Sequence, residues 1–266
     1  MPHPTLSSTG RAIRDRLTAA CLPDEVVSPI VPQLLAAGRW WPADRPWPEP
    51  LTAGLIEPRR GYRFKPENAT LALLLHGQRA ERLLDLGAGS GSLLLIAWTL
   101  TRPAHAAAIE RQPEQLDRLR RTLRAHAIPA PALQADLRAP ATHRAALDAL
   151  GGRPDLIVAN PPFFPTGWGR PSREPSTHLS THAEHGGVAE FITAGADLLA
   201  PTGRMLVVFD AARLAHLMAA VGDADLRVER VAWIPDQRRG AAPDPFRVWV
   251  TLARQGTEIT RLIDSP

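Results

Sequence analysis

The segment VANPPFFP, residues 158–165, ends an apolar run with an asparagine, two prolines and two aromatic rings. These groups suit chemistry on an amino group conjugated to a ring, because its delocalised lone pair must be turned toward an incoming electrophile. The side-chain oxygen of Asn160 and the backbone carbonyl of Pro161 can each accept one N–H of that amine. The two prolines stiffen the turn, since proline has a fixed φ and no N–H. A rigid strand exit alone would explain the prolines but not the asparagine.

The next residue, Phe163, offers a ring that can stack on a planar substrate. No strong base is needed, because the aminium formed by attack on an electrophile sheds its proton readily. Catalysis is then mostly positioning of the reactants, which can supply about 7–11 kcal/mol. We therefore expect Asn160, Pro161, Pro162 and Phe163 to form the catalytic segment.

A second candidate segment is LLDLGAGSG, residues 83–91, which reads as a strand, an aspartate and three glycines that open a helix. Glycine allows a positive φ and a close approach of a ligand to the backbone. A dinucleotide fingerprint requires a further glycine three positions after its second one, and Ser92 stands there, so the pyrophosphate-binding pattern fails. Glu110 and Asp136 end the next two predicted strands. Because ligands of such sheets bind beyond the carboxyl ends of the strands, the three features together indicate one ligand site.

From about residue 80 onward, predicted strands alternate with predicted helices, and these elements must position the candidate site residues. Apolar runs predict strands over 82–87, 105–110, 131–136, 154–160 and 204–210, with helices from Ser92 and over 113–126, 142–150, 187–200 and 211–220. This alternation implies a parallel sheet covered on both faces. The last two runs, 226–234 and 246–253, have no helix between them and predict an antiparallel pair at one edge. The fold class expected is α/β, a Rossmann-like, doubly wound, seven-stranded sheet with an antiparallel C-terminal strand pair.

Residues 1–50 break this rhythm. Two segments, STGRAIRDRLTAAC and DEVVSPIVPQLLAAG, have helical patterns, and Pro29 and Pro32 interrupt the second. RWWPADRPWPEP follows, with three tryptophans and four prolines in twelve residues. Its indoles either pack on the domain or offer a stacking surface for nucleic acid. We interpret residues 1–50 as a short helical, Trp/Pro-rich extension and residues 51–266 as the catalytic domain.

The composition of the chain limits its possible partners, cross-links and metal sites. The 266 residues carry a net charge of 31 − 27 = +4, which permits a polyanionic partner without requiring one. Cys21 is the only cysteine, which excludes an intramolecular disulfide and a cysteine-based zinc site. With no apolar leader and no membrane-length apolar segment, we expect a soluble, cytoplasmic protein with no membrane partner. His178, His182 and His185 have a spacing seen in zinc sites, but we expect no metal and interpret 165–186 as a basic substrate-binding lid.

The D-x-G-x-G-x-G form of the glycine loop resembles the motif of class I S-adenosylmethionine-dependent methyltransferases. The resemblance implies S-adenosylmethionine as cofactor, its methionine part held by Asp85 and the 87–91 backbone. It implies that Glu110 accepts from the ribose hydroxyls and that Asp136 recognises the adenine amino group. The cofactor-binding residues expected are Phe64, Glu67, Asp85, Gly87, Ala88, Gly89, Gly91, Glu110, Arg111, Asp136, Leu137 and Asn160.

The segment NPPF resembles the (N/D)PP(Y/F) signature of methyltransferases that act on amino groups of adenine, cytosine, guanine or glutamine. LTAGLIEPRRGYRF (51–64), NPPFFPTGWGRPSREPSTHLSTHAEHGG, LLAPTGRMLVVF and VWVTLARQGTEITRLI are similar to the bacterial tRNA adenine-N6 methyltransferases that modify a valine tRNA beside its anticodon. This similarity covers about residues 51–265 and implies RNA, in particular tRNA, as partner. Two departures are Phe163, where that family commonly has tyrosine, and Glu67, where it usually has aspartate.

Three other functions stay open on the sequence alone. A glutamine-amide methyltransferase would modify a translation protein, and residues 1–50 could help to dock it. An rRNA or DNA amino methyltransferase would use the same chemistry on another polynucleotide. An RNA-binding protein with a vestigial fold would need no chemistry, but it would have no reason to keep Asp85, Glu110 and Asn160 together.

Overall fold

The structure is a computed structural model that describes residues 38–40, 71, 74–75, 77–162, 187–235 and 245–254. The predicted helices of the N-terminal extension and the predicted lid over 165–186 lie outside the described residues.

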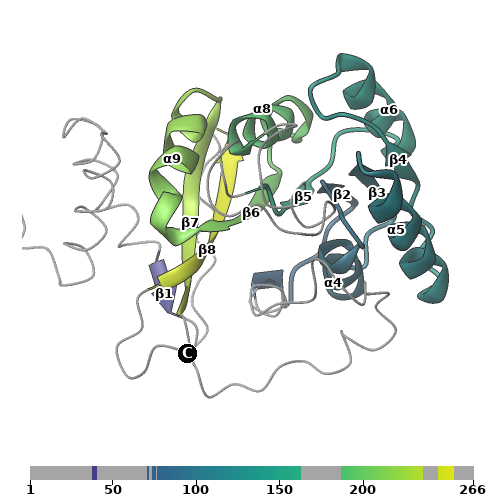
Figure 1. Cartoon of the computed structure of the whole chain (residues 1–266), viewed down its shortest axis with the longest axis horizontal. Coiled ribbons are helices and arrows are strands. Elements are labelled where there is room, and N and C mark those ends of the chain that lie inside the picture. The colour runs from purple at the N-terminus through teal and green to yellow at the C-terminus, as the bar shows by residue number, and fades with distance from the viewer. Residues whose placement is uncertain are drawn as a thin grey trace, which may run out of the picture.

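Within this part of the chain, eight strands form one mixed sheet in the order β1-β7-β8-β6-β5-β2-β3-β4 (Figure 1). Their bounds are Gly38–Trp40 (β1), Arg82–Leu86 (β2), His105–Glu110 (β3), Ala132–Gln134 (β4), Leu156–Ala159 (β5), Arg204–Asp210 (β6), Leu226–Pro235 (β7) and Pro245–Arg254 (β8). The strands β2 to β6 pair in parallel, and β8 lies antiparallel between β6 and β7. The predicted seven-stranded sheet with its antiparallel C-terminal pair is confirmed.

The strand β1 is an addition to the predicted sheet. It pairs in parallel with β7, with Gly38 opposite Val231, so three residues of the predicted extension join the sheet edge. This strand could not be predicted, because three residues are too few for an alternating pattern to be recognised.

Helices cover both faces of the sheet (Figure 1). One apolar cluster joins the sheet to α4 (Ser92–Thr101) and α5 (Pro113–Ala125). The other cluster joins it to α6 (Pro140–Leu150), α8 (Val188–Leu198) and α9 (Leu214–Gly222), with a short 3-10 turn, η2 (Ala211–Arg213), before α9. All four residues of β5 are buried, as expected for a central strand covered on both sides.

The order of the strands defines where a ligand can enter. The chain runs outward from β2 to β3 and β4, then returns to place β5 on the other side of β2. The loops that follow β2 and β5 therefore lead away in opposite directions, which opens a crevice at the carboxyl ends of these two strands. The glycine loop follows β2, and Asn160 follows β5.

Among the described residues, no helix has the length and apolar character needed to cross a membrane. The same residues contain no cluster of three or more side chains able to hold a metal ion, while His178, His182 and His185 lie outside them.

Candidate active site

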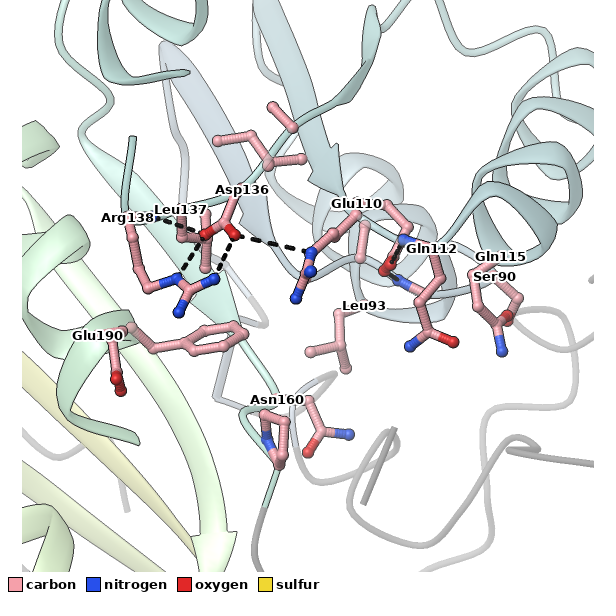
Figure 2. A pocket seen from close by; sticks show the side chains of 18 of the residues that line it. Ser90, Leu93, Glu110, Gln112, Gln115, Asp136, Leu137, Arg138, Asn160 and Glu190 are labelled. Atoms are coloured by element: carbon pink, nitrogen blue, oxygen red, sulfur yellow. Dashed lines mark hydrogen bonds and ion pairs between the residues drawn. The ribbon is translucent and has the colours of Figure 1, made fainter. Parts of the chain in front are cut away.

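A pocket lies at the carboxyl ends of β2, β3 and β5 and beside the loop after β4 (Figure 2). Nine of the predicted site residues line it: Gly87, Ala88, Gly89, Glu110, Arg111, Asp136, Leu137, Asn160 and Pro162. Asp85, Gly91 and Pro161 are described but do not line the pocket. Phe64, Glu67 and Phe163 lie outside the described residues, so their predicted roles stay predictions.

The glycine loop has a backbone that only glycine adopts readily. Gly87 and Gly91 have φ angles of +67° and +91°. A Cβ on Gly87 would lie 2.8 Å from the ring of Phe191, and a Cβ on Gly91 would lie 2.7 Å from Cδ1 of Leu119. These two glycines are therefore required both by their φ angles and by the close packing of α8 and α5 against the loop.

Glu110 ties this loop to the end of β3. Its side chain is 5% exposed; Oε2 accepts from the N–H of Gly89 at 2.8 Å and Oε1 from the N–H of Gln112 at 2.7 Å. Burial raises the pKa of the carboxyl, and these backbone hydrogen bonds oppose the rise. Each carboxylate oxygen has about two acceptor sites, so the carboxylate can still accept from a ribose hydroxyl.

Asp85 lies beneath the glycine loop and is fully buried. Its Oδ2 accepts from the N–H of Leu94 at 3.0 Å, in the first turn of α4. Its Oδ1 has no hydrogen-bond partner in the described structure. Burial raises the pKa of Asp85 to about 8, and the nearby charge of Glu110 adds to the rise. An ionised Asp85 is therefore a buried charge with no paired cation, which is energetically costly. A cationic ligand group near the carboxylate would reduce this cost.

Asp136 lies two residues beyond Gln134, the last residue of β4, so it belongs to a loop and not to the strand that we predicted over 131–136. Its carboxylate is held by Arg138: Oδ1 accepts from the N–H and Nε at 3.0 Å each, and Oδ2 accepts from Nη2 at 2.6 Å. Arg111 adds an ion pair at 3.6 Å. The Arg138 hydrogen bonds are the main reason that the pKa of Asp136 falls to about 2. An adenine amino group bound here would meet a carboxylate that two arginines already contact.

Asn160 follows the last residue of β5 and lines the pocket with Pro162. In Figure 2 its side chain lies across the pocket from Asp136. The structure thus brings the predicted amine-orienting group into the same pocket as the predicted cofactor groups. Pro161 is buried and does not line the pocket.

Ten further residues line the pocket that the sequence analysis did not select: Ser90, Ser92, Leu93, Ile109, Gln112, Gln115, Ala135, Arg138, Glu190 and Phe191. Most are neighbours of predicted residues. Glu190 and Phe191 are distant in sequence and enter from the first turn of α8, where Oε2 of Glu190 accepts from the N–H of Gly187 at 2.7 Å. Glycine followed three residues later by glutamate is a readable helix-start signal, but it does not reveal that this helix reaches the pocket.

The family model for the methyltransferase small domain matches residues 65–223, which is more than half of the chain and includes every described residue of the pocket. The chain belongs to the methyltransferase small domain family. The predicted class of enzyme, a methyltransferase that depends on S-adenosylmethionine, is thereby confirmed. No curated protein sequence matches this methyltransferase significantly.

Solved structures resemble the methyltransferase in fold. A candidate RNA methyltransferase from Pyrococcus horikoshii has a TM-score of 0.52 and 15% identity, over 77% of this chain and 95% of that chain. A ribosomal protein L11 methylase from Lactobacillus delbrueckii subsp. bulgaricus has a TM-score of 0.47 and 15% identity, over 71% and 80% of the two chains. A tRNA (uracil-54, C5)-methyltransferase from Pyrococcus abyssi, solved with S-adenosyl-L-homocysteine, has a TM-score of 0.43 and 13% identity, over 70% and 37%. The first of these supports the Rossmann-like methyltransferase fold.

The cofactor of the methyltransferase is S-adenosylmethionine, and the pocket fits it in three respects. Asp85 is fully buried and does not line the pocket, and its unpartnered Oδ1 would favour a cationic methionine end bound nearby. Gly89 has a φ of +56° and open space where a side chain would stand, so a ligand can approach its backbone. Glu110 keeps acceptor sites for the ribose hydroxyls.

Proposed function

We propose that the methyltransferase transfers a methyl group to an exocyclic amino group, specifically N6 of adenine in tRNA. The observation that carries the amino-group assignment is the position of Asn160 at the end of β5, in one pocket with the glycine loop and Glu110 and followed by two prolines. A hydroxyl acceptor would require a base to remove its proton. The polar side chain at the end of β5 is Asn160, an amide that can orient an amine but is no base.

Residues of this chain orient the substrate amine for the reaction. The side-chain oxygen of Asn160 and the carbonyl of Pro161 accept the two N–H bonds of the substrate amine and turn its lone pair out of the ring plane. The bound cofactor supplies an electrophilic methyl group on a sulfonium sulfur. The nitrogen lone pair forms the new N–C bond while the C–S bond breaks, and the aminium then releases one proton to solvent. Positioning by Asn160 is therefore the main catalytic contribution.

The choice of adenine in tRNA rests on the similarity of residues 51–265 to the tRNA adenine-N6 methyltransferases. A base in an anticodon loop has few pairing contacts to lose when it leaves its stack. Five arginines are candidates to bind phosphates because they lie near the predicted site in sequence: Arg59, Arg60, Arg63, Arg170 and Arg173. All five lie outside the described residues. If about four of them contact phosphates, log affinity for single-stranded RNA should fall against log salt with a slope near −3, from about 0.7 per contact.

The experiment that separates the possible substrates uses labelled S-adenosylmethionine with total RNA and total protein from a bacterial extract. Label in tRNA supports the proposal. Label on a glutamine of a translation protein would replace it with the glutamine-amide function, and label in rRNA or DNA would keep the chemistry but change the substrate. Asn160→Ala is the matched variant, since it should lower turnover much more than cofactor affinity if Asn160 acts at the transition state.

A further inference from the structure

Two side chains of the first turn of α6 hold the loop that carries Asp136. The hydroxyl of Thr142 donates to the carbonyl of Asp136 at 2.7 Å, and Nε2 of His143 lies 2.8 Å from the carbonyl of Leu137. A carbonyl only accepts, so Nε2 of His143 carries the hydrogen in this contact. Neither Thr142 nor His143 lines the pocket. Any influence on a ligand must therefore pass through the loop.

These two hydrogen bonds fix two consecutive peptide planes. Because a peptide unit is planar, holding the carbonyl of Asp136 also sets the direction of the Leu137 N–H. Holding the carbonyl of Leu137 sets the direction of the Arg138 N–H, which donates to Oδ1 of Asp136 at 3.0 Å. The bonds from α6 thus orient both the Leu137 N–H and the Asp136 carboxylate.

The oriented groups form a donor and an acceptor side by side. Within the described residues the N–H of Leu137 donates to no hydrogen bond, and both Leu137 and Asp136 line the pocket. The Watson–Crick edge of adenine has the complementary pair, an acceptor at N1 and a donor at N6. Hypoxanthine has a donor at N1 and an acceptor at O6, so it would face the same two groups with both matches reversed.

We propose that Thr142 and His143 are positioning residues that make the pocket selective for the adenine of its cofactor. The inference rests on the binding of S-adenosylmethionine in this pocket with its adenine at residues 136–138. It does not depend on which substrate is methylated. Nδ1 of His143 also lies 3.6 Å from Oδ2 of Asp197 on α8, beyond hydrogen-bond distance. The hydrogen bonds that hold the loop from outside the pocket therefore come from α6.

The test measures binding of S-adenosylhomocysteine and S-inosylhomocysteine to the full chain by calorimetry. The unmodified protein should prefer the adenine compound by about tenfold or more, since a site built around hydrogen bonds rejects a ligand that mismatches them. Thr142→Val and His143→Leu should each weaken binding of the adenine compound by about 3- to 10-fold, the worth of one hydrogen bond. Binding of the hypoxanthine compound should change little, so the ratio of the two affinities falls.

Variants that keep the donor serve as rescue controls. Thr142→Ser retains the hydroxyl and His143→Gln retains an N–H near the place of Nε2, so both should keep most of the preference. Arg144→Ala, at an exposed neighbouring position of α6, should change neither affinity. Far-UV circular dichroism and thermal melting identify any variant that has lost its fold.

The affinities for the two compounds test the role of Thr142 and His143. An unchanged ratio in folded Thr142→Val and His143→Leu proteins would overturn the proposal, and so would an equal loss of affinity for both compounds, which indicates a general structural role. If the unmodified protein bound both compounds equally, the loop would not read adenine and the inference would fail while the amino-group function stood. If it bound neither compound, the cofactor assignment, and the proposed function with it, would fail.

Discussion

The raised pKa of Asp85 predicts that cofactor binding releases a proton. With a pKa of about 8, Asp85 is ionised in only about a tenth of the molecules at pH 7 and about a hundredth at pH 6. If the cationic methionine end binds the ionised form, protonation of Asp85 raises the dissociation constant for S-adenosylmethionine about fivefold from pH 8 to pH 7, and protonation of the ligand amino group reduces the net rise to about threefold. The dissociation constant should rise about ninefold more from pH 7 to pH 6. Binding at pH 7 should release about 0.9 proton per site.

Asp85→Asn is the matched variant, because the amide keeps an acceptor for the Leu94 N–H and cannot ionise. Calorimetry in buffers of different ionisation enthalpy measures the released protons directly. We expect the variant to bind more weakly than the unmodified protein at pH 8, to release no proton from this site and to lose the pH dependence between pH 6 and 7.5. The amino group of the ligand titrates near pH 8, and its contribution remains in the variant, so the difference between the two proteins isolates Asp85.

The same residue predicts a pH dependence of stability. The pKa of Asp85 is higher in the folded protein than in the unfolded chain, so its contribution to the free energy of unfolding is fully present below about pH 4 and is lost as pH rises to about 8. The loss is on the order of 5 kcal/mol, and Asp85→Asn should remove it, so that the variant gains stability relative to the unmodified protein as pH rises. A flat affinity from pH 6 to 8 in the unmodified protein, with no proton released, would refute this reasoning.

Three other substitutions should change cofactor affinity or the free energy of unfolding by predictable amounts. Glu110→Ala should weaken S-adenosylmethionine binding by about 1.5–3 kcal/mol in calorimetry, and unchanged affinity in a folded protein would remove its assignment. Gly91→Ala should lower the free energy of unfolding by about 1–3 kcal/mol in denaturant titration, because its φ is +91° and a Cβ would meet Leu119; a neutral effect would contradict the packing argument. Arg254→Ala should lower stability by about 1–2 kcal/mol, because the guanidinium donates to the carbonyls of Ala196 and Leu199 at the end of α8, and an unchanged melting curve would show that these contacts are dispensable.

The sequence was sufficient for seven of the eight strands and for Glu110 and Asn160 at the strand ends. A strand buried on both faces needs a continuous apolar run, and β5 and β6 show such runs with little ambiguity. Parallel pairing then brings the carboxyl ends of the strands to one edge, which is why Glu110 and Asn160 could be placed together from order alone.

The remaining features depend on contacts between segments that are distant in sequence or on side-chain direction. Phe191 packs on Gly87 across more than a hundred positions of sequence, and no local pattern reports such a contact. Arg138 turns back onto Asp136 although it could equally extend into solvent. The high pKa of Asp85 arises from complete burial, which a strand-ending aspartate does not reveal until the packing around it is known.

We propose that the methyltransferase methylates an amino group that Asn160 orients, and that this amine is N6 of adenine in tRNA. Mass spectrometry of nucleosides from tRNA incubated with S-adenosylmethionine and either the unmodified protein or Asn160→Ala tests it most directly. We expect N6-methyladenosine with the unmodified protein and at most a few per cent of that rate with the variant, while calorimetry shows similar cofactor affinity for both. Absence of methylated adenine from the treated tRNA, or near-normal turnover by Asn160→Ala, would contradict the claim.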